Sequence, residues 1–223
     1  MKTAIIALSA LFAGLVSAQN MCGDYEVMVS GIKGRVQCDY RHEASKHFKQ
    51  SGSTYNFWGY TGDKPHSKNS NTNPRTEMTL KAYTFDYNAV TSFEGRFRVP
   101  TYVRPPFIIF QIFNQRKNGD TGSATSLHLT CVGNDLKPSY GGSKVYKHGV
   151  KSDDPNSWTR VKVEVNKGTI KIFVDGKHVD TQTLEKPGAP YHFKFGSYAG
   201  ESSNETSQKT KFEIFWDNIV VKK

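Results

Sequence analysis

Short runs in which apolar and polar residues alternate are the dominant pattern along this chain. Residues 92–100 alternate phenylalanine and valine with glutamate and arginine, and residues 158–166 alternate valine with arginine, lysine and glutamate. Successive side chains of a β-strand point to opposite faces of the sheet. Each run therefore predicts a strand with one face toward a core and one face toward solvent.

Further strands are predicted over 73–83, 107–115, 126–132, 169–176, 191–200 and 211–221. Helix signals are scarce, and glycine, proline and asparagine separate the runs. We find no internal repeat and no low-complexity linker. The pattern predicts an all-β fold, in which two antiparallel sheets pack face to face as a sandwich or jelly roll. The polar stretch 61–74 is expected to form a loop at the rim of a binding face.

The first 18 residues combine a short basic start, an apolar stretch and a small-residue cleavage site before Gln19. This is the pattern of a secretory signal peptide. We therefore expect a secreted protein whose residues 19–223 form one domain. No later run is long enough to span a bilayer, so we expect no membrane partner. The sequence Asn204-Glu-Thr is a glycosylation sequon and predicts a surface loop there.

Three cysteines are present, namely Cys22, Cys38 and Cys131. Secretion permits a disulfide, and Cys22–Cys38 is the favoured pair because both lie near the start of the mature chain. Cys131 would then be free and buried. Three single pairings remain open on the sequence alone. The spacing of cysteine and histidine residues shows no zinc motif.

Lysine and arginine total 30 against 20 acidic residues, which gives a formal net charge of +10. Acidic polysaccharides are the abundant polyanions outside cells, and a positive surface attracts them. Many secreted proteins are basic without such a partner, so the charge alone does not decide the function. We expect an acidic polysaccharide partner, no nucleic acid, and a monomer.

Polar side chains of unusual type lie on the outward faces of three predicted strands. In the stretch 191–200, Phe193 and Phe195 face the core, and the opposite face carries the side chains of His192, Lys194 and Tyr198.

The two other strands carry Arg75 with Glu77, and Gln111 after four apolar residues. A polar residue in a buried strand needs a reason. If the three strands are neighbours, Arg75, Gln111, Lys194 and Tyr198 share one concave surface.

RTEM at 75–78, QIF at 111–113 and FKFGSY at 193–198 resemble, in this order, the signature strands of alginate lyases and of the related glucuronan lyases. The resemblance covers residues 70–221. It implies a concanavalin A-like β-jelly roll with a substrate groove across a concave sheet. It also implies that uronic-acid polymers are cleaved by β-elimination, with no cofactor required for the chemistry.

The sequence departs from the alginate lyase pattern at several positions. Thr79 stands where a second arginine is usual, Phe113 stands where histidine is frequent, and Ala199 and Gly200 replace an asparagine and a glutamine. The missing histidine favours a glucuronan-like branch, in which glutamine and tyrosine carry the chemistry.

The resemblance implies roles for individual residues. A lyase removes the C5 proton beside a uronate carboxylate and expels the 4-linked oxygen, so the carboxylate charge must be offset first. Gln111 can donate a hydrogen bond and Arg75 a charge-assisted one. Tyr198 is the candidate base and acid, because nearby cations favour a phenolate.

Expected substrate contacts are Lys194, His192, His47, Glu77 and Phe113, with His192 and His47 as alternative bases. Jelly rolls of this type also often hold a structural calcium ion away from the groove.

Asp217 in the last strand fits such a calcium site by position. Calcium needs six to eight oxygen ligands and the sequence identifies one. A carboxylate in a β-bulge or turn is therefore the plainer interpretation of Asp217.

Other functions are also compatible with a β-sandwich. A laminarinase-type glycoside hydrolase needs two carboxylates, carried as Glu-x-Asp-x-x-Glu, and residues 213–218 have the wrong spacing. A non-catalytic, lectin-like protein would use aromatic platforms such as Phe113, Trp58 or Tyr60. A secreted effector or structural protein that has lost activity is a third alternative.

Overall fold

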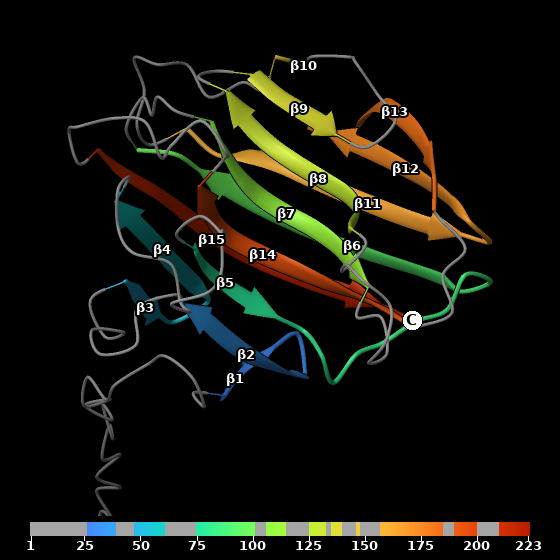
Figure 1. Cartoon of the computed structure of the whole chain (residues 1–223), viewed down its shortest axis with the longest axis horizontal. Helices are drawn as coiled ribbons and strands as arrows, with labels where there is room; N and C mark the ends of the chain where they lie inside the picture. The colour runs from blue at the N-terminus through green and yellow to red at the C-terminus, as the bar shows by residue number, and fades with distance from the viewer. Residues whose placement is uncertain are drawn as a thin grey trace, which may run out of the picture.

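The computed structural model describes residues 26–38, 47–60, 75–100, 106–114, 125–132, 135–139, 146–147, 157–184, 190–199 and 210–223. These residues form two antiparallel β-sheets that pack face to face (Figure 1). The predicted signal peptide, the loop at 61–74, Cys22 and Asn204 lie outside the described residues. No helix long and apolar enough to cross a membrane occurs in the part of the chain that the structure describes.

The front sheet in Figure 1 has eight strands. Their spatial order is β1 (Glu26–Val29), β2 (Ile32–Cys38), β5 (Arg75–Thr79), β14 (Tyr191–Ala199), β7 (Phe107–Asn114), β8 (Thr125–Val132), β9 (Asp135–Ser139) and β10 (Tyr146–Lys147).

The rear sheet has seven strands. Their order is β13 (Lys177–Thr183), β12 (Thr169–Val174), β11 (Thr159–Asn166), β6 (Val90–Arg98), β15 (Lys211–Lys222), β4 (Thr54–Tyr60) and β3 (Phe48–Ser51). The two strands nearest the C-terminus hold inner positions. β14 lies between β5 and β7, and β15 lies between β6 and β4.

The core lies between the two sheets and is rich in aromatic rings. Phe193 and Phe195 are fully buried, as the alternation in β14 predicts. Phe93 lies 5.8 Å from Phe193, and Phe57 lies 5.7 Å from Phe195, measured between ring centroids. Tilted and edge-to-face ring pairs of this kind add to the free energy gained by burying apolar area. Tyr191 and Ala199 belong to the same core, and these contacts fix β14 with the side chains of His192 and Lys194 on its opposite face. Cys131 is free and buried in this core.

A bulge interrupts β14 beside the predicted catalytic tyrosine. The register with β7 shifts between Phe195 and Tyr198, and Gly196 has a φ of +146°. A Cβ atom at Gly196 would lie 2.5 Å from the backbone oxygen of Thr76 and 2.8 Å from the Cα of Glu77. Glycine therefore allows β14 to approach β5 closely here, and the bulge changes the direction of the residues that follow.

Candidate active site

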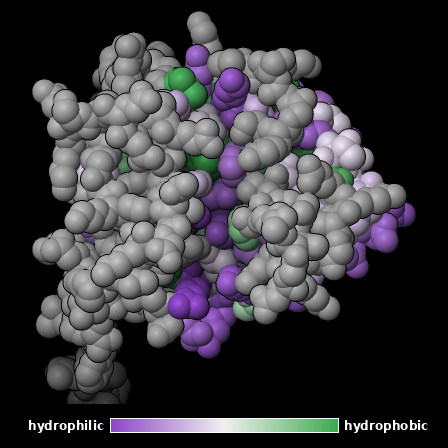
Figure 2. Space-filling model, in the orientation of Figure 1, coloured by the Kyte–Doolittle hydropathy of each residue, from purple (hydrophilic) through white to green (hydrophobic). Residues whose placement is uncertain are grey.

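A row of polar side chains crosses the outer face of the eight-stranded sheet. Lys194 on β14 is paired in register with Thr79 on β5 and with Gln111 on β7, and Gln111 is paired with His128 on β8. Side chains of residues paired in this way lie on the same face of a sheet. Figure 2 shows a hydrophilic strip along a hollow on this face of the molecule. We call this surface, which carries Lys194, Gln111 and His128 and the side chains beside them, the trough.

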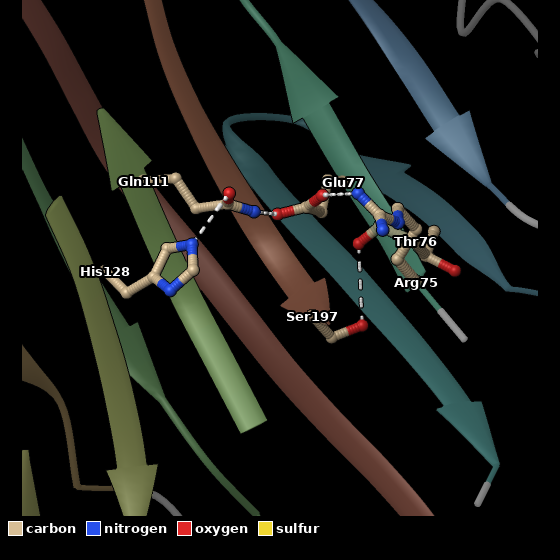
Figure 3. Close-up of polar contacts among 6 residues, drawn as sticks. All are labelled: Arg75, Thr76, Glu77, Gln111, His128 and Ser197. Atoms are coloured by element: carbon tan, nitrogen blue, oxygen red, sulfur yellow. Dashed lines mark hydrogen bonds and ion pairs between the residues drawn. The ribbon is translucent and has the colours of Figure 1, made fainter. Parts of the chain in front are cut away.

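Gln111, Glu77 and Arg75 form a connected polar chain in the trough (Figure 3). The amide nitrogen of Gln111 donates a hydrogen bond to Oε1 of Glu77. Nη1 of Arg75 lies 3.8 Å from Oε2 of the same carboxylate. Glu77 is fully buried, and a buried carboxylate is tolerated only with such partners. The two groups predicted to offset a substrate carboxylate therefore both contact Glu77.

Arg75 also contacts Tyr198, its register partner on β14. The guanidinium carbon lies 4.1 Å from the centroid of the tyrosine ring. This is a cation–π contact. It brings together two residues more than 120 positions apart in the chain, and it places a positive charge over the Tyr198 ring.

A second group of residues lies along the trough from Gln111. The ammonium nitrogen of Lys194 lies 4.2 Å from the centroid of the Phe113 ring. The centroid of the His192 ring lies 5.4 Å from that of the Phe113 ring. His192 is fully buried, and Nε2 of its ring has no hydrogen-bond partner among the described residues. Burial, together with the nearby charges of Lys194 and Lys81, lowers the pKa of His192 to about 3. His192 is therefore neutral at ordinary pH.

His128 is also part of the trough, although it belongs to none of the three sequence motifs. Nε2 of His128 lies 3.2 Å from Oε1 of Gln111 (Figure 3). Burial, with the charges of Arg75 and Lys194, lowers the pKa of His128 to about 4. The sequence signal that could have identified it is its polar position within the alternating run 126–132. Its proximity to Gln111 depends on the pairing of β7 with β8.

The trough side chains are more buried than the sequence pattern suggests. Alternation predicts an open polar face, but Gln111 is 2% exposed and Lys194 is 3% exposed. The reason is lateral packing, since Gln111 contacts Glu77 and His128 while Lys194 lies over Phe113. These groups are partly desolvated before a ligand arrives, and electrostatic interactions between them are stronger as a result.

The structure does not bring His47 to the trough. Its ring lies 6.2 Å from Trp58 and 6.1 Å from Tyr60, two residues of β4 in the other sheet. Phe48 faces the core, as the alternation predicted, but His47 is itself buried, at 5% exposure, and lies just before β3. The expectation of an exposed strand residue was therefore wrong, and alternation within one strand also cannot identify the sheet to which that strand belongs.

The structure also does not support the expected calcium site at Asp217. One carboxylate oxygen accepts a hydrogen bond from Arg96 at 2.7 Å, and the other accepts one from Ser53 at 3.0 Å. Burial raises the pKa of Asp217, but the hydrogen bonds from Arg96, Ser53 and the Asn218 amide outweigh it and lower the pKa overall. Asp217 precedes a register shift in β15, as expected for a bulge carboxylate. No group of three metal-ligating side chains occurs among the described residues.

Comparison with proteins of known sequence identifies one curated relative, a citrate-binding protein from Hevea brasiliensis. It is 30% identical over 211 residues, which cover 93% of this chain and 80% of the relative.

Solved structures of alginate lyases share the fold. The family 7 alginate lyase AlyA1 from Zobellia galactanivorans superposes with a TM-score of 0.63 at 18% identity, covering 79% of this chain and 80% of that one. Alginate lyase PA1167 from Pseudomonas aeruginosa gives a TM-score of 0.60 at 20% identity, covering 82% and 87%. These similarities confirm the predicted jelly roll.

A family model described as alginate lyase matches residues 26–223, which include every described strand. The match extends beyond the three short motifs on which the resemblance was based, because it begins at β1 and continues through β15. The chain therefore belongs to the alginate lyase family of polysaccharide lyases.

Proposed function

We propose that this protein is a secreted lyase that cleaves a 1,4-linked polyuronate by β-elimination. The observation that supports this most is the meeting of Arg75, Gln111 and Tyr198 on three adjacent strands. A guanidinium, a carboxamide and a phenol in one trough are the groups that the reaction needs. The trough lies in a basic protein, which favours the approach of an acidic polymer.

The first requirement is to offset the charge of the uronate carboxylate. A carboxamide has two N–H groups, and Gln111 donates one of them to Glu77. The other can be donated to the substrate carboxylate. Arg75 supplies the positive charge. Donors held in place before the reaction stabilise the negative charge that develops as the C5 proton leaves.

Tyr198 then acts first as base and afterwards as acid. As phenolate it takes the proton from C5, and the electron pair of that C–H bond forms the C4–C5 double bond. The bond between C4 and the glycosidic oxygen breaks, and this oxygen receives the proton from Tyr198. Arg75 stabilises the phenolate electrostatically, because its guanidinium lies over the ring.

Glu77 has a supporting role in this proposal. The buried carboxylate of Glu77 would repel a substrate carboxylate if the two groups were in direct contact. Its contacts with Gln111 and Arg75 instead hold both groups in place. Lys194 and Phe113 are the proposed contacts for the neighbouring sugar, and the buried His192 is proposed to bind a polar group of that sugar.

Glucuronan is the proposed polymer, and alginate is the alternative. The preference depends on Phe113, which occupies the position where alginate lyases often have histidine. The test is to incubate the protein with glucuronan, polymannuronate and polyguluronate and to follow the ultraviolet absorbance of the unsaturated uronate product. No increase in absorbance with any polymer would refute the lyase assignment.

A Tyr198→Phe variant should lose turnover and keep polymer binding. The matched control is Tyr87→Phe, which removes a phenol hydroxyl near Gly168, away from the trough. Turnover by Tyr198→Phe at the wild-type rate would mean that another group is the base.

Carboxylate binding without cleavage is a second candidate function. The citrate-binding relative favours it, as do the cationic side chains of Arg75 and Lys194 in the trough. Calorimetry with citrate and with each polymer separates the two functions. Citrate binding that Lys194→Met abolishes, without any polymer cleavage, would favour this candidate.

A further inference from the structure

We propose that His128 is a positioning residue, which as a neutral Nε2–H imidazole fixes the carboxamide of Gln111 with its amino group toward Glu77. This inference rests on the proposed lyase function for its kinetic consequence. Its structural content, the tautomer of His128 and the orientation of Gln111, stands independently of that function.

The hydrogen-bond chain determines where the protons lie. The carboxylate of Glu77 only accepts hydrogen bonds, and it lies 3.8 Å from the guanidinium of Arg75 as an ion pair. The group of Gln111 that contacts Glu77 must therefore be the amide nitrogen. The amide oxygen then faces His128, with 3.2 Å between Oε1 and Nε2. An oxygen acceptor needs a donor, so Nε2 of His128 carries the proton.

The surroundings keep the imidazole neutral. The side chain is half-buried, and the charges of Arg75 on β5 and Lys194 on β14 oppose a further positive charge. Gln111 on β7 is uncharged, and Glu77 lies on the far side of it. A neutral histidine can donate to Gln111 without adding a charge that would bind the uronate on its own.

The consequence is that the carboxamide of Gln111 is held in one orientation and does not flip. If Gln111 rotated by half a turn, its oxygen would face the Glu77 carboxylate and its amino group would face an N–H donor. Both hydrogen bonds would be lost, and buried polar groups would be left without partners. The second N–H of Gln111 is therefore directed consistently, as a donor to a substrate carboxylate must be. The low pKa of His128 also makes it a poor base, which leaves that role to Tyr198.

The first test uses nuclear magnetic resonance on the full chain with nitrogen-15-labelled histidine. The signals of His128 are assigned by their loss in a His128→Gln variant. At near-neutral pH we expect the neutral Nε2–H tautomer, and in a Gln111→Leu variant we expect this preference to weaken. A neutral Nδ1–H tautomer, or a charged imidazolium, would overturn the proposal. This measurement needs no lyase activity, so it separates failure of this inference from failure of the proposed function.

The second test is kinetic. His128→Gln keeps an N–H donor and should retain wild-type kcat within a few-fold. His128→Leu removes the donor and should lower kcat by about tenfold to a hundredfold with little change in KM, because a displacement of a catalytic group by about 1 Å can cost about a hundredfold in rate. Thr130→Val, two residues further along β8 on the same face, is the control and should behave as the wild type. Thermal unfolding identifies any variant that has lost its fold. A Leu variant with wild-type kcat, or a Gln variant as impaired as the Leu variant, would overturn the proposal.

Discussion

Replacing Gly196 with alanine should destabilise the protein by bringing two strands of the trough into collision. The added Cβ would lie 2.5 Å from the backbone oxygen of Thr76 and 2.8 Å from the Cα of Glu77. Both atoms belong to the backbone of β5, which cannot move as a flexible side chain can. The φ of +146° is also unfavourable for alanine.

The expected loss of stability has two parts. Forcing an extra methyl group into a packed site costs about 1–3 kcal/mol, and holding a non-glycine residue in strained backbone costs about 1–3 kcal/mol. Together they give a loss of about 2–6 kcal/mol. Gly176→Ala is the matched control, because Gly176 has a φ of +80° and a Cβ atom added there would meet nothing within 4 Å. The control carries the strain without the collision.

Urea unfolding followed by circular dichroism measures the difference between the two variants. If the collision costs about 1–3 kcal/mol and the slope is about 3 kcal/mol per molar urea, the midpoint of Gly196→Ala should lie ~0.3–1 M below that of Gly176→Ala. Lyase activity of the folded Gly196→Ala protein should also fall, since β5 carries Arg75 and Glu77. Equal midpoints for the two variants would show that β14 and β5 are not in close contact at this point.

Two further predictions concern pH. The free energy of unfolding should decrease as pH falls below about 6.5, because His128 and His192 stay neutral in the folded chain, with pKa values of about 4 and about 3, while unfolded histidines take up protons. Urea titrations at about pH 7 and about pH 5 should show that the free energy of unfolding decreases less in His192→Gln than in the wild type. An equal decrease in the two proteins would contradict this account. Asp217→Asn should cost about 1 kcal/mol at neutral pH, because the partner Arg96 is 41% exposed and the ion pair is screened. The pKa of Asp217 is lowered in the folded chain. The wild type should therefore have the larger free energy of unfolding above about pH 4, and this difference should disappear as pH falls through the folded pKa. A difference in the free energy of unfolding that stays constant with pH would refute this prediction.

The fold was predictable where alternation is strong. The runs that became β6 and β11 bury alternate residues as expected, whereas β14 buries eight of its nine residues. Among the strands that were not predicted, β9 and β13 have polar sequences, DLKPS and KHVDTQT, that carry little alternation. They are strands because a neighbouring strand offers its backbone groups for pairing. Such pairing depends on tertiary structure and leaves little trace in a short stretch of sequence.

The site was predictable in part. The family motifs identified Arg75, Gln111 and Tyr198, and these residues do lie on adjacent strands. The motifs could not identify His128, because its contact with Gln111 follows from the register between β7 and β8. Alternation also could not predict the burial of Lys194. That burial results from contacts between side chains on neighbouring strands, such as the one with Phe113.

The inner positions of β14 and β15 have a consequence for how the protein is made. Both strands come from residues 191–223, yet each separates two strands that are synthesised earlier. Until the ribosome has released this segment, β5 and β7 lack a common partner, and so do β4 and β6. A nascent chain that stops short of residue 191 can complete neither sheet and exposes unpaired strand edges, which favour aggregation. Folding should therefore wait until residues 191–223 have been synthesised.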